Sequence, residues 1–246
     1  MSTADLPEER RMTLLEHLAE LRMRLIRAGL ALIAGILAGI VLTRPFLELL
    51  ISPLGDNRPQ SLRPAENIMV YFKVDLILGL IIAMPVIIYQ IFAFIMPGLT
   101  PKERRYVIGI SLAAAVLFGL GVAFASLVML PFTLSYLQSF LSDLIVPSYS
   151  IDYYISFVTH FVFYVGLSFE LPLVIAALAR LGIVSPQQLS KGRRYAIVLI
   201  AVAAAVITPT PDPFNMTLVM LPLLVLYELG IILARFAYRP RPSLSE

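Results

Sequence analysis

Residues 150–181 read SIDYYISFVTHFVFYVGLSFELPLVIAALARL, an almost wholly apolar stretch long enough to cross a lipid bilayer as a helix. Glu170 lies deep inside it, ten residues before Arg180. At about 1.5 Å per helical residue, it would lie about 15 Å from a membrane surface at Arg180, near the bilayer midplane. An ionisable group at that depth is costly without a partner, so Glu170 is a candidate functional residue. The alternative is a structural role, in which a protonated or hydrogen-bonded Glu170 holds two helices together.

The composition is that of an integral membrane protein. Of the 246 residues, 59% are hydrophobic and 14% are charged, and the mean hydropathy is +0.87. The chain has no cysteine and two histidines, His17 and His160, so it offers no disulfide and no thiol-ligated metal site. Phosphate-loop, HExxH and CxxC motifs are also missing. We therefore expect no enzyme activity, no metal or cofactor, and no nucleic-acid partner.

The apolar pattern predicts an all-α membrane protein with a single domain over residues 1–246 and six transmembrane helices. The fifth and sixth spans are expected to be short, and Gly35 and Gly39 in the first span predict close helix packing. Extramembrane loops are predicted at residues 44–70, 132–150 and 209–213. The spans cover about residues 25–43, 71–96, 106–131, 151–180, 195–208 and 214–234.

A separate amphipathic helix is predicted before the first span, at residues 13–24 (TLLEHLAELRMR). Thr13 and Glu16 have the spacing of a capping box, which begins a helix. Leucines at every third or fourth position then form one apolar stripe opposite Glu16, Glu20 and Arg24. This pattern is typical of a helix that lies at the membrane surface.

The distribution of Lys and Arg predicts the orientation in the membrane. Fifteen of these nineteen residues fall in segments 1–27, 97–105, 180–194 and 235–246, and three fall in the loop 44–70. Cytoplasmic segments of membrane proteins are enriched in Lys and Arg. We therefore expect both termini in the cytoplasm and the three loops on the periplasmic side.

Three carboxylates, those of Glu16, Glu20 and Glu103, accompany the arginines of the predicted cytoplasmic surface. One interpretation is local: Glu20 and Arg24 have i,i+4 spacing, which stabilises a helix by about 0.3–0.5 kcal/mol. Glu103 would likewise complement the positive N-terminus of the third span. The other interpretation is that these carboxylates accept guanidinium groups of a partner protein through charge-assisted, often bidentate hydrogen bonds. Spacing alone leaves both open.

An ordered set of motifs resembles one family of membrane proteins. The segment HLAELRMR (17–24) is similar to the N-terminal signature of the TatC family, the multi-spanning core of the twin-arginine protein translocase. Each motif is weak alone, but the ordered set covers about residues 12–237 and is specific. The further motifs are SPL (52–54), PVIIYQIFAF (85–94), PGL (97–99), ERR (103–105), FELP (169–172), TPTPDP (208–213) and YE (227–228).

The resemblance implies a receptor and core subunit of the twin-arginine translocation complex, in the bacterial cytoplasmic (inner) membrane. Such a subunit binds Arg-Arg signal peptides of folded precursors and exports them with the proton motive force. The implied partners are TatA- and TatB-type single-span proteins and further copies of the same chain, all within the lipid bilayer.

Positions that match the family's motifs carry the implied site residues. Signal-peptide contacts fall on Glu20 and Glu103, and the surrounding positions are Arg22, Phe94, Leu99, Arg104 and Arg105. Glu170 matches an intramembrane glutamate expected to meet a polar group on a single-span partner. Pro53 and Asp212 match positions that shape a periplasmic cap, and the fifth and sixth spans match the docking region for TatB-type helices.

A proton- or solute-coupled secondary transporter, with Glu170 as the carrier group, is the main alternative. It explains a carboxylate at membrane depth, but it leaves Glu20 and Glu103 at the surface without a role. It also predicts further polar groups along a path through the membrane, for which the chain offers His160, Lys73, Asp75 and Glu228. A purely structural scaffold would require neither kind of site.

Overall fold

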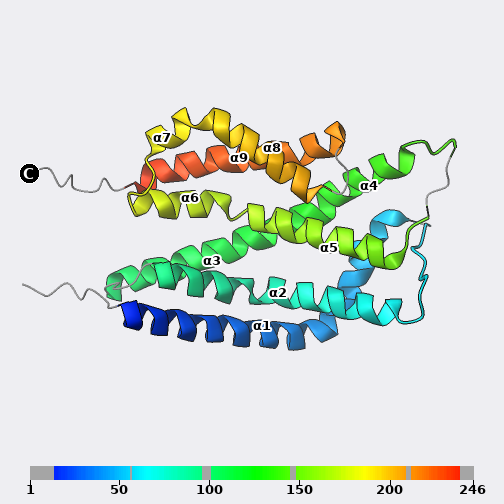
Figure 1. The fold of residues 1–246 in the computed structure, drawn as a ribbon, viewed down its shortest axis with the longest axis horizontal. Coiled ribbons are helices and arrows are strands. Elements are labelled where there is room, and N and C mark those ends of the chain that lie inside the picture. The colour runs from blue at the N-terminus through cyan, green and yellow to red at the C-terminus, as the bar shows by residue number, and fades with distance from the viewer. Residues whose placement is uncertain (1–13, 56, 96–100, 145–147, 209–211, 239–246) are drawn as a thin grey trace, which may run out of the picture.

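The computed structural model describes residues 14–55, 57–95, 101–144, 148–208 and 212–238. Within these ranges every regular element is helical, apart from one isolated parallel bridge between Gln60 and Ser150, so the all-α prediction is confirmed (Figure 1). A 3₁₀ turn, η1, and a π-helical turn, η2, accompany the α-helices. In chain order the elements are α1 (Leu14–Ile51), η1 (Ser52–Leu54), α2 (Glu66–Ile95), α3 (Pro101–Phe124), η2 (Ala125–Met129), α4 (Leu130–Ser139), α5 (Ile151–Ser168), α6 (Leu171–Arg180), α7 (Pro186–Lys191), α8 (Arg193–Ile207) and α9 (Pro213–Ala237).

The helices run back and forth between two ends of an elongated bundle (Figure 1). The first described turn of α1 and the last turn of α9 lie at the same end, which we call the terminal end. The connections 52–65 and 148–150 lie at the opposite end, which we call the loop end. Helix α1 packs along α2, both α2 and α3 pack on α5, and α9 packs against α6 and α8.

Five segments of the described chain are long and apolar enough to cross a membrane: Leu15–Leu54, Glu66–Phe94, Ile108–Ser139, Ile151–Arg180 and Pro213–Ala237. The predicted fifth span corresponds to α8, whose 15 residues extend about 22 Å, less than a hydrocarbon core of about 30 Å. The predicted sixth span is longer than expected, because α9 has 25 residues. The bundle is therefore that of a multi-pass membrane protein with one short helix near the C-terminus.

Helix α1 merges two predicted elements. No break separates the expected surface helix 13–24 from the first span 25–43, and the helix continues to Ile51 through Pro45. Neither glycine nor proline interrupts the sequence at the junction of the two segments, and extending a helix is easier than nucleating a new one. The same effect carries the third span past its predicted end at residue 131 to Ser139, through η2 and α4.

Two glycines allow α1 and α2 to approach closely, as their spacing predicted. A Cβ atom on Gly35 would lie 2.3 Å from the backbone oxygen of Gly79, and one on Gly39 would lie 2.7 Å from Oδ1 of Asp75. The Thr43 hydroxyl lies 3.0 Å from the same Asp75 oxygen, and both side chains are buried. Small residues and a buried polar contact thus fix α1 on α2.

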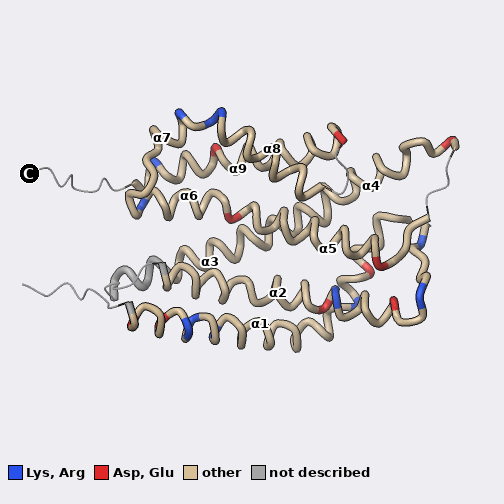
Figure 2. Tube along the Cα trace, viewed as in Figure 1, with Lys and Arg blue, Asp and Glu red and all other residues tan. Residues whose placement is uncertain are grey.

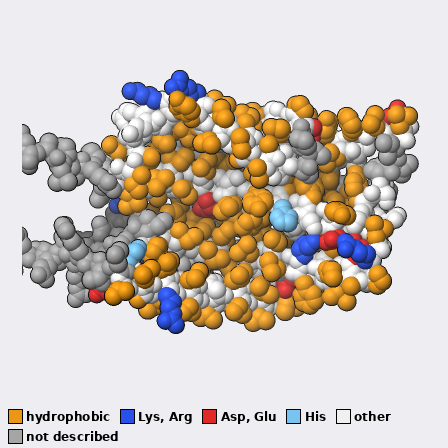
Figure 3. All heavy atoms as spheres, in the orientation of Figure 1, with side chains coloured by type: hydrophobic (Ala, Val, Ile, Leu, Met, Phe, Trp, Pro, Cys, Tyr) orange, Lys and Arg blue, Asp and Glu red, His pale blue; other side chains and the backbone are white. Residues whose placement is uncertain are grey.

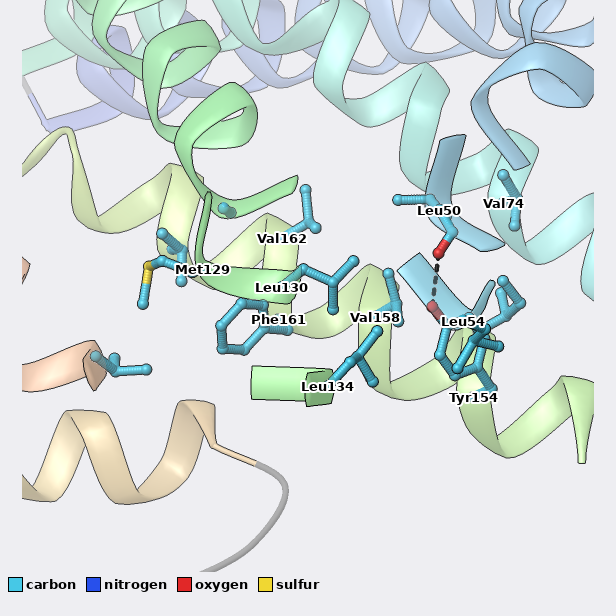
Figure 4. Close-up of a cluster of buried hydrophobic side chains, with 14 of the residues drawn as sticks. Leu50, Leu54, Val74, Met129, Leu130, Leu134, Tyr154, Val158, Phe161 and Val162 are labelled. Carbon is cyan, nitrogen blue, oxygen red and sulfur yellow. Dashed lines mark hydrogen bonds between the residues drawn. The ribbon is translucent and has the colours of Figure 1, made fainter. Parts of the chain in front are cut away.

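The largest hydrophobic cluster lies toward the loop end and joins several helices (Figure 4). Leu50 of α1, Val74 of α2, Leu130 of α4 and Val158 of α5 are fully buried in it. The Tyr154 hydroxyl donates a hydrogen bond of 2.6 Å to the backbone oxygen of Leu50, which ties α5 to the end of α1.

The segment that contains Glu170 is not one continuous helix. Helix α5 ends at Ser168 and α6 begins at Leu171, so Phe169 and Glu170 form a turn between them. Pro172 lacks a backbone N–H and cannot donate to the carbonyl four residues earlier, which interrupts the helical hydrogen bonds here. The predicted single span 151–180 therefore consists of two helices with Glu170 at their junction.

Charged residues gather toward the two ends of the bundle and leave long uncharged stretches between them (Figure 2). The face seen in Figure 3 is mainly hydrophobic between those ends. Many outward-facing side chains of α1 are large and apolar, among them Leu25, Leu30 and Leu37. Such a surface suits contact with lipid tails, whereas a soluble protein rarely exposes so large an apolar area.

Candidate functional site

Glu20 lies on α1 near the terminal end and is held by a cation of its own helix. Arg24 Nε donates to Glu20 Oε1 at 2.9 Å, and Arg24 Nη2 donates to the same oxygen. Both side chains are about one-fifth exposed. Arg24 Nη1 also donates to Gln90 Oε1 of α2 at 3.4 Å. The ion pair predicted from i,i+4 spacing is therefore present, and it is anchored across the α1–α2 contact.

The second carboxylate oxygen of Glu20 has a different environment. Glu20 Oε2 is buried, and no described residue donates a hydrogen bond to it. A buried acceptor without a donor costs free energy, and the cost is larger when the group is charged. Glu20 thus presents one oxygen that is satisfied within the chain and one that is available to a donor from outside the described residues.

Phe94 lies at the same contact between α1 and α2. Its ring stacks on the imidazole of His17, with ring centroids 4.5 Å apart and an interplanar angle of 16°. The stack fixes the first turns of α1 against the last turns of α2. Phe94 and Glu20, both predicted as site residues, are therefore positioned by the same pair of helices.

The other predicted signal-peptide residues are placed only in part. Glu103, Arg104 and Arg105 belong to the first turns of α3, which begins at the terminal end (Figure 1). Arg22 is exposed on α1. Leu99 lies outside the described residues. The starts of α1 and α3 thus lie at the same end of the bundle as the last turn of α2.

The surroundings of Glu170 differ from those of Glu20. Its side chain is only 6% exposed, and no described residue donates to its Oε1. It does not cap α6 with its side chain, although it occupies the N-cap position of that helix. It borders a groove of about 390 Å³, which is otherwise lined by Leu167, Ser168, Leu171, Val174, Leu199, Ile200, Ala203 and Leu223.

The shape of this groove follows from the helices that form it. One wall is the α5–α6 junction, and the other comes from α8 and α9. Apart from Ser168, every described residue around Glu170 in the groove is apolar, and no lysine or arginine is among the described residues that line it. A carboxyl group at this position can accept a hydrogen bond from a polar group that enters the groove, but the groove itself supplies no cation.

The two predicted cap residues lie at chain reversals. Pro53 is the middle residue of η1, directly after α1. Asp212 is the N-cap of α9, where its Oδ1 accepts a hydrogen bond of 2.8 Å from the Asn215 backbone and its Oδ2 accepts one of 2.9 Å from the Asn215 amide. Both residues have a structural role at the ends of helices.

Glu66 organises the loop end, although it was not predicted as a site residue. Its carboxylate accepts hydrogen bonds from the Ser150 hydroxyl at 2.6 Å and from the Asp152 backbone at 3.2 Å. It also accepts bonds from the backbone amides of Leu62 at 2.6 Å and Arg63 at 2.9 Å. A carboxylate before an apolar run is the sequence signal for such a role. Leu62 and Arg63 are its local partners, whereas Ser150 and Asp152 lie more than 80 positions away and require the fold.

The polar groups that a transporter would need are bound to different partners. Lys73 donates to Asp152 and Ser156, and Arg193 donates to both oxygens of Glu228 at 2.6 and 2.9 Å. Asp75 is buried against α1, as described above. Among the described residues no group of three His, Asp or Glu side chains could hold a metal ion. These contacts do not link the polar residues to Glu170.

Sequence reasoning missed Gln90 and the His17–Phe94 stack. Both contacts join residues of α1 to residues more than 60 positions later, so spacing within one helix cannot reveal them. A glutamine in the otherwise apolar second half of α2 was the available signal, because a buried amide requires a polar partner.

The sequence is similar to known proteins over most of its length. A sequence model of the family described as "Sec-independent protein translocase protein (TatC)" matches residues 16–222. The chain is 37% identical over 241 residues to the TatC protein of Aquifex aeolicus, which covers 96% of this chain and 100% of that protein. It is 36% identical over 231 residues to TatC of Carboxydothermus hydrogenoformans, with 93% and 95% covered. The chloroplastic TATC of Pisum sativum is 36% identical over 236 residues, which cover 95% of this chain and 67% of that protein.

Two solved structures share the fold. One, described as "Crystal Structure of Twin Arginine Translocase Receptor- TatC", superposes with a TM-score of 0.78 at 38% identity and covers 91% of this chain and all of its own. A second crystal structure of such a receptor, in DDM, gives a TM-score of 0.80 at 38% identity, with 89% and 99% covered. These matches extend over nearly all of the sequence and the fold, and they show that this chain belongs to the TatC family of Sec-independent protein translocase proteins.

Proposed function

We propose that this TatC protein is a receptor for Arg-Arg signal peptides of folded precursors, with Glu20 as a contact for a signal-peptide guanidinium. As a member of its family the chain is a protein translocase component and not a classical enzyme. The solved structures that share its fold are described as twin arginine translocase receptors.

The observation that carries the proposal is the free oxygen of Glu20. It is buried at the terminal end of α1 and lacks a donor among the described residues. Guanidinium groups satisfy such oxygens with short, charge-assisted hydrogen bonds, and their planar fork can also engage a second carboxylate. Glu103, at the start of α3, is the second carboxylate in this proposal. Arg22, Phe94, Leu99, Arg104 and Arg105 complete the site.

The proposed receptor presents this site to the cytoplasm, with both chain ends on that side. The excess of Lys and Arg in the segments that contain or flank the terminal end supports this orientation. Because the chain has no cysteine, single cysteines can test it in spheroplasts with a membrane-impermeant maleimide. Ser61→Cys at the loop end should react from outside, whereas Gln187→Cys on α7 should react only after permeabilisation; the reverse pattern would refute the orientation.

The proposal assigns Glu170 to assembly. A TatA- or TatB-type single-span protein would lie along the groove beside Glu170, with α8 and α9 as its docking region, and Pro53 and Asp212 would shape the periplasmic cap. The apolar lining supports a helix as the occupant, because a membrane helix presents apolar side chains with few polar groups. In this proposal, export is driven by the proton motive force and is carried out by a complex that contains several copies of this chain.

Co-purification of the full-length protein with a signal peptide tests the receptor assignment. We expect an Arg-Arg peptide to be retained and a matched Lys-Lys peptide to be lost, because lysine lacks the bidentate fork. The Arg-Arg peptide should also be lost when Glu20 and Glu103 are both changed to glutamine, while the variant remains inserted in the membrane. Equal retention of both peptides, or unchanged retention by the double variant, would contradict the proposal.

A further inference from the structure

Arg24 is a guanidinium that already occupies the carboxylate proposed to receive a guanidinium. Two of its nitrogen atoms donate to Glu20 Oε1, and the third reaches Gln90 Oε1 at 3.4 Å. Arg24 is therefore not a free surface cation; it is held by two helices at once. Any incoming arginine meets a Glu20 whose charge is already balanced.

We propose that Arg24 is an internal competitor for the signal-peptide arginine, and this inference rests on the receptor function proposed above. Binding of the peptide is then an exchange, in which its guanidinium first engages the free Oε2 of Glu20 and then spans both carboxylate oxygens, while the fork of Arg24 is released from Oε1. An exchange of like groups weakens the complex relative to binding at an empty carboxylate. Lower affinity among related complexes mostly reflects faster dissociation. Faster dissociation would benefit a receptor that must later release its precursor protein.

The groups around the pair support exchange over a rigid, permanent ion pair. Arg24 and Glu20 are each about one-fifth exposed, so water and an incoming peptide can reach them. The groove beside them, of about 370 Å³, is open on its outer side, and its described lining residues all belong to α1: Glu16, Ala19, Glu20, Met23, Arg24 and Arg27. Arg24 can swing into this groove when Glu20 is taken by another guanidinium.

Competition and positioning predict opposite results. If Arg24 merely holds Glu20 in the right rotamer, its loss weakens peptide binding and blurs the preference for Arg-Arg over Lys-Lys. If Arg24 competes, its loss strengthens binding of both peptides by the same factor, because the same internal pair is broken in each case. The ratio of the two affinities therefore stays constant under competition.

The chain offers a matched control in Arg27. It lies three positions further along α1, is exposed, and within the described part of the chain donates to the sulfur of Met23 at 3.3 Å. Arg27→Gln removes the same charge from the same groove without touching Glu20. It therefore reports how much of any effect comes from the general loss of positive charge.

The test is a fluorescence-anisotropy titration of the full-length protein in nanodiscs with labelled Arg-Arg and Lys-Lys signal peptides. We expect Arg24→Gln to lower the Kd for both peptides about fivefold, the effect of removing a partly exposed ion pair worth about 1 kcal/mol. Arg24→Lys should give a smaller gain because a point charge makes one contact where the fork makes two. Arg27→Gln should leave both Kd values nearly unchanged.

A fourth variant tests the same ion pair if Arg24→Gln fails to fold. Gln90→Leu removes the anchor of Arg24 and should raise affinity slightly, in the same direction. Unchanged or weaker peptide binding by the Arg24 and Gln90 variants, with wild-type preference for Arg-Arg and a strong loss in Glu20→Gln, would overturn the competitor role and leave the receptor function intact. Failure of the wild type to prefer Arg-Arg, together with no effect of Glu20→Gln, would instead overturn the receptor function itself, and the competitor role with it.

Discussion

Two carboxylates of this protein share one property and differ in everything around them. Glu20 and Glu170 each have a buried oxygen to which no described residue donates. Glu20 lies near a bundle end beside Arg24 and Gln90. Glu170 lies at a break between two helices, in a groove whose described lining residues include no cation. The surroundings decide which ligand each carboxylate suits: a guanidinium can exchange at Glu20, whereas a polar group on an apolar helix suits Glu170.

The largest effect should separate the two residues in peptide binding. Glu20→Gln should raise the Kd for an Arg-Arg signal peptide about a hundredfold, since the amide cannot form a charge-assisted pair with the guanidinium. Glu170→Gln should change the same Kd by less than about twofold. Titration of both variants in nanodiscs with the Arg-Arg peptide measures the two Kd values. A comparable loss in the two variants would show that the carboxylates do not have separate functions.

Glu170 should dominate a different measurement, the association with a single-span membrane protein. Glu170→Leu removes every hydrogen-bonding atom and should reduce co-purification of such a partner about tenfold. Glu170→Gln keeps an acceptor and should retain most of the association. If glutamine and leucine are equally harmful, a hydrogen bond is not the basis of the contact. If neither matters, the partner binds elsewhere.

The His17–Phe94 stack should have a moderate effect on the Glu20 site alone. Phe94→Leu removes an aromatic pair that holds the start of α1 on α2, and it should weaken peptide binding about threefold. His17→Leu removes the same pair, so the double variant should lose little more than either single one. An additive loss in the double-mutant cycle would indicate that the two rings act independently.

Glu228 should have the smallest effect. It forms a bidentate pair with Arg193 on the partly exposed surface between α8 and α9. Glu228→Gln should leave peptide binding unchanged, because the pair lies on other helices than the Glu20 site. A strong loss of peptide binding in this variant would mean that the receptor responds to any change of charge in the bundle.

The sequence predicts the helical class and the course of the long spans because twenty or more consecutive apolar residues leave few alternatives to a membrane helix. Helix ends are predicted less well. Helix α1 continues to Ile51 and α4 to Ser139 into segments that contain prolines and polar residues, because the extension of an existing helix outweighs the local preference of these residues. The turn at Glu170 was predictable from Pro172, which lacks a backbone N–H. The length of the apolar run favoured a single continuous helix instead.

For the site residues too, contacts within one helix were predictable and contacts between distant segments were not. The pair of Glu20 and Arg24 follows from spacing within one helix, and the structure contains it. The contact of Arg24 with Gln90 and the hydrogen bonds from Ser150 and Asp152 to Glu66 join positions that are far apart in the chain, so they depend on how helices and loops pack. The free oxygens of Glu20 and Glu170 could not be predicted either, because the lack of a donor is a property of the whole neighbourhood.

The contact between α1 and α2 has a consequence for how the protein is made. Asp75 lies within the second span, and a hydroxyl of the first span, that of Thr43, lies within hydrogen-bond distance of its carboxyl group. Gly39 leaves the space that this approach requires. A lone second helix would carry that carboxyl group into lipid without this hydroxyl, which is unfavourable. The first two spans should therefore enter the bilayer together, as a hairpin, once the ribosome has released both.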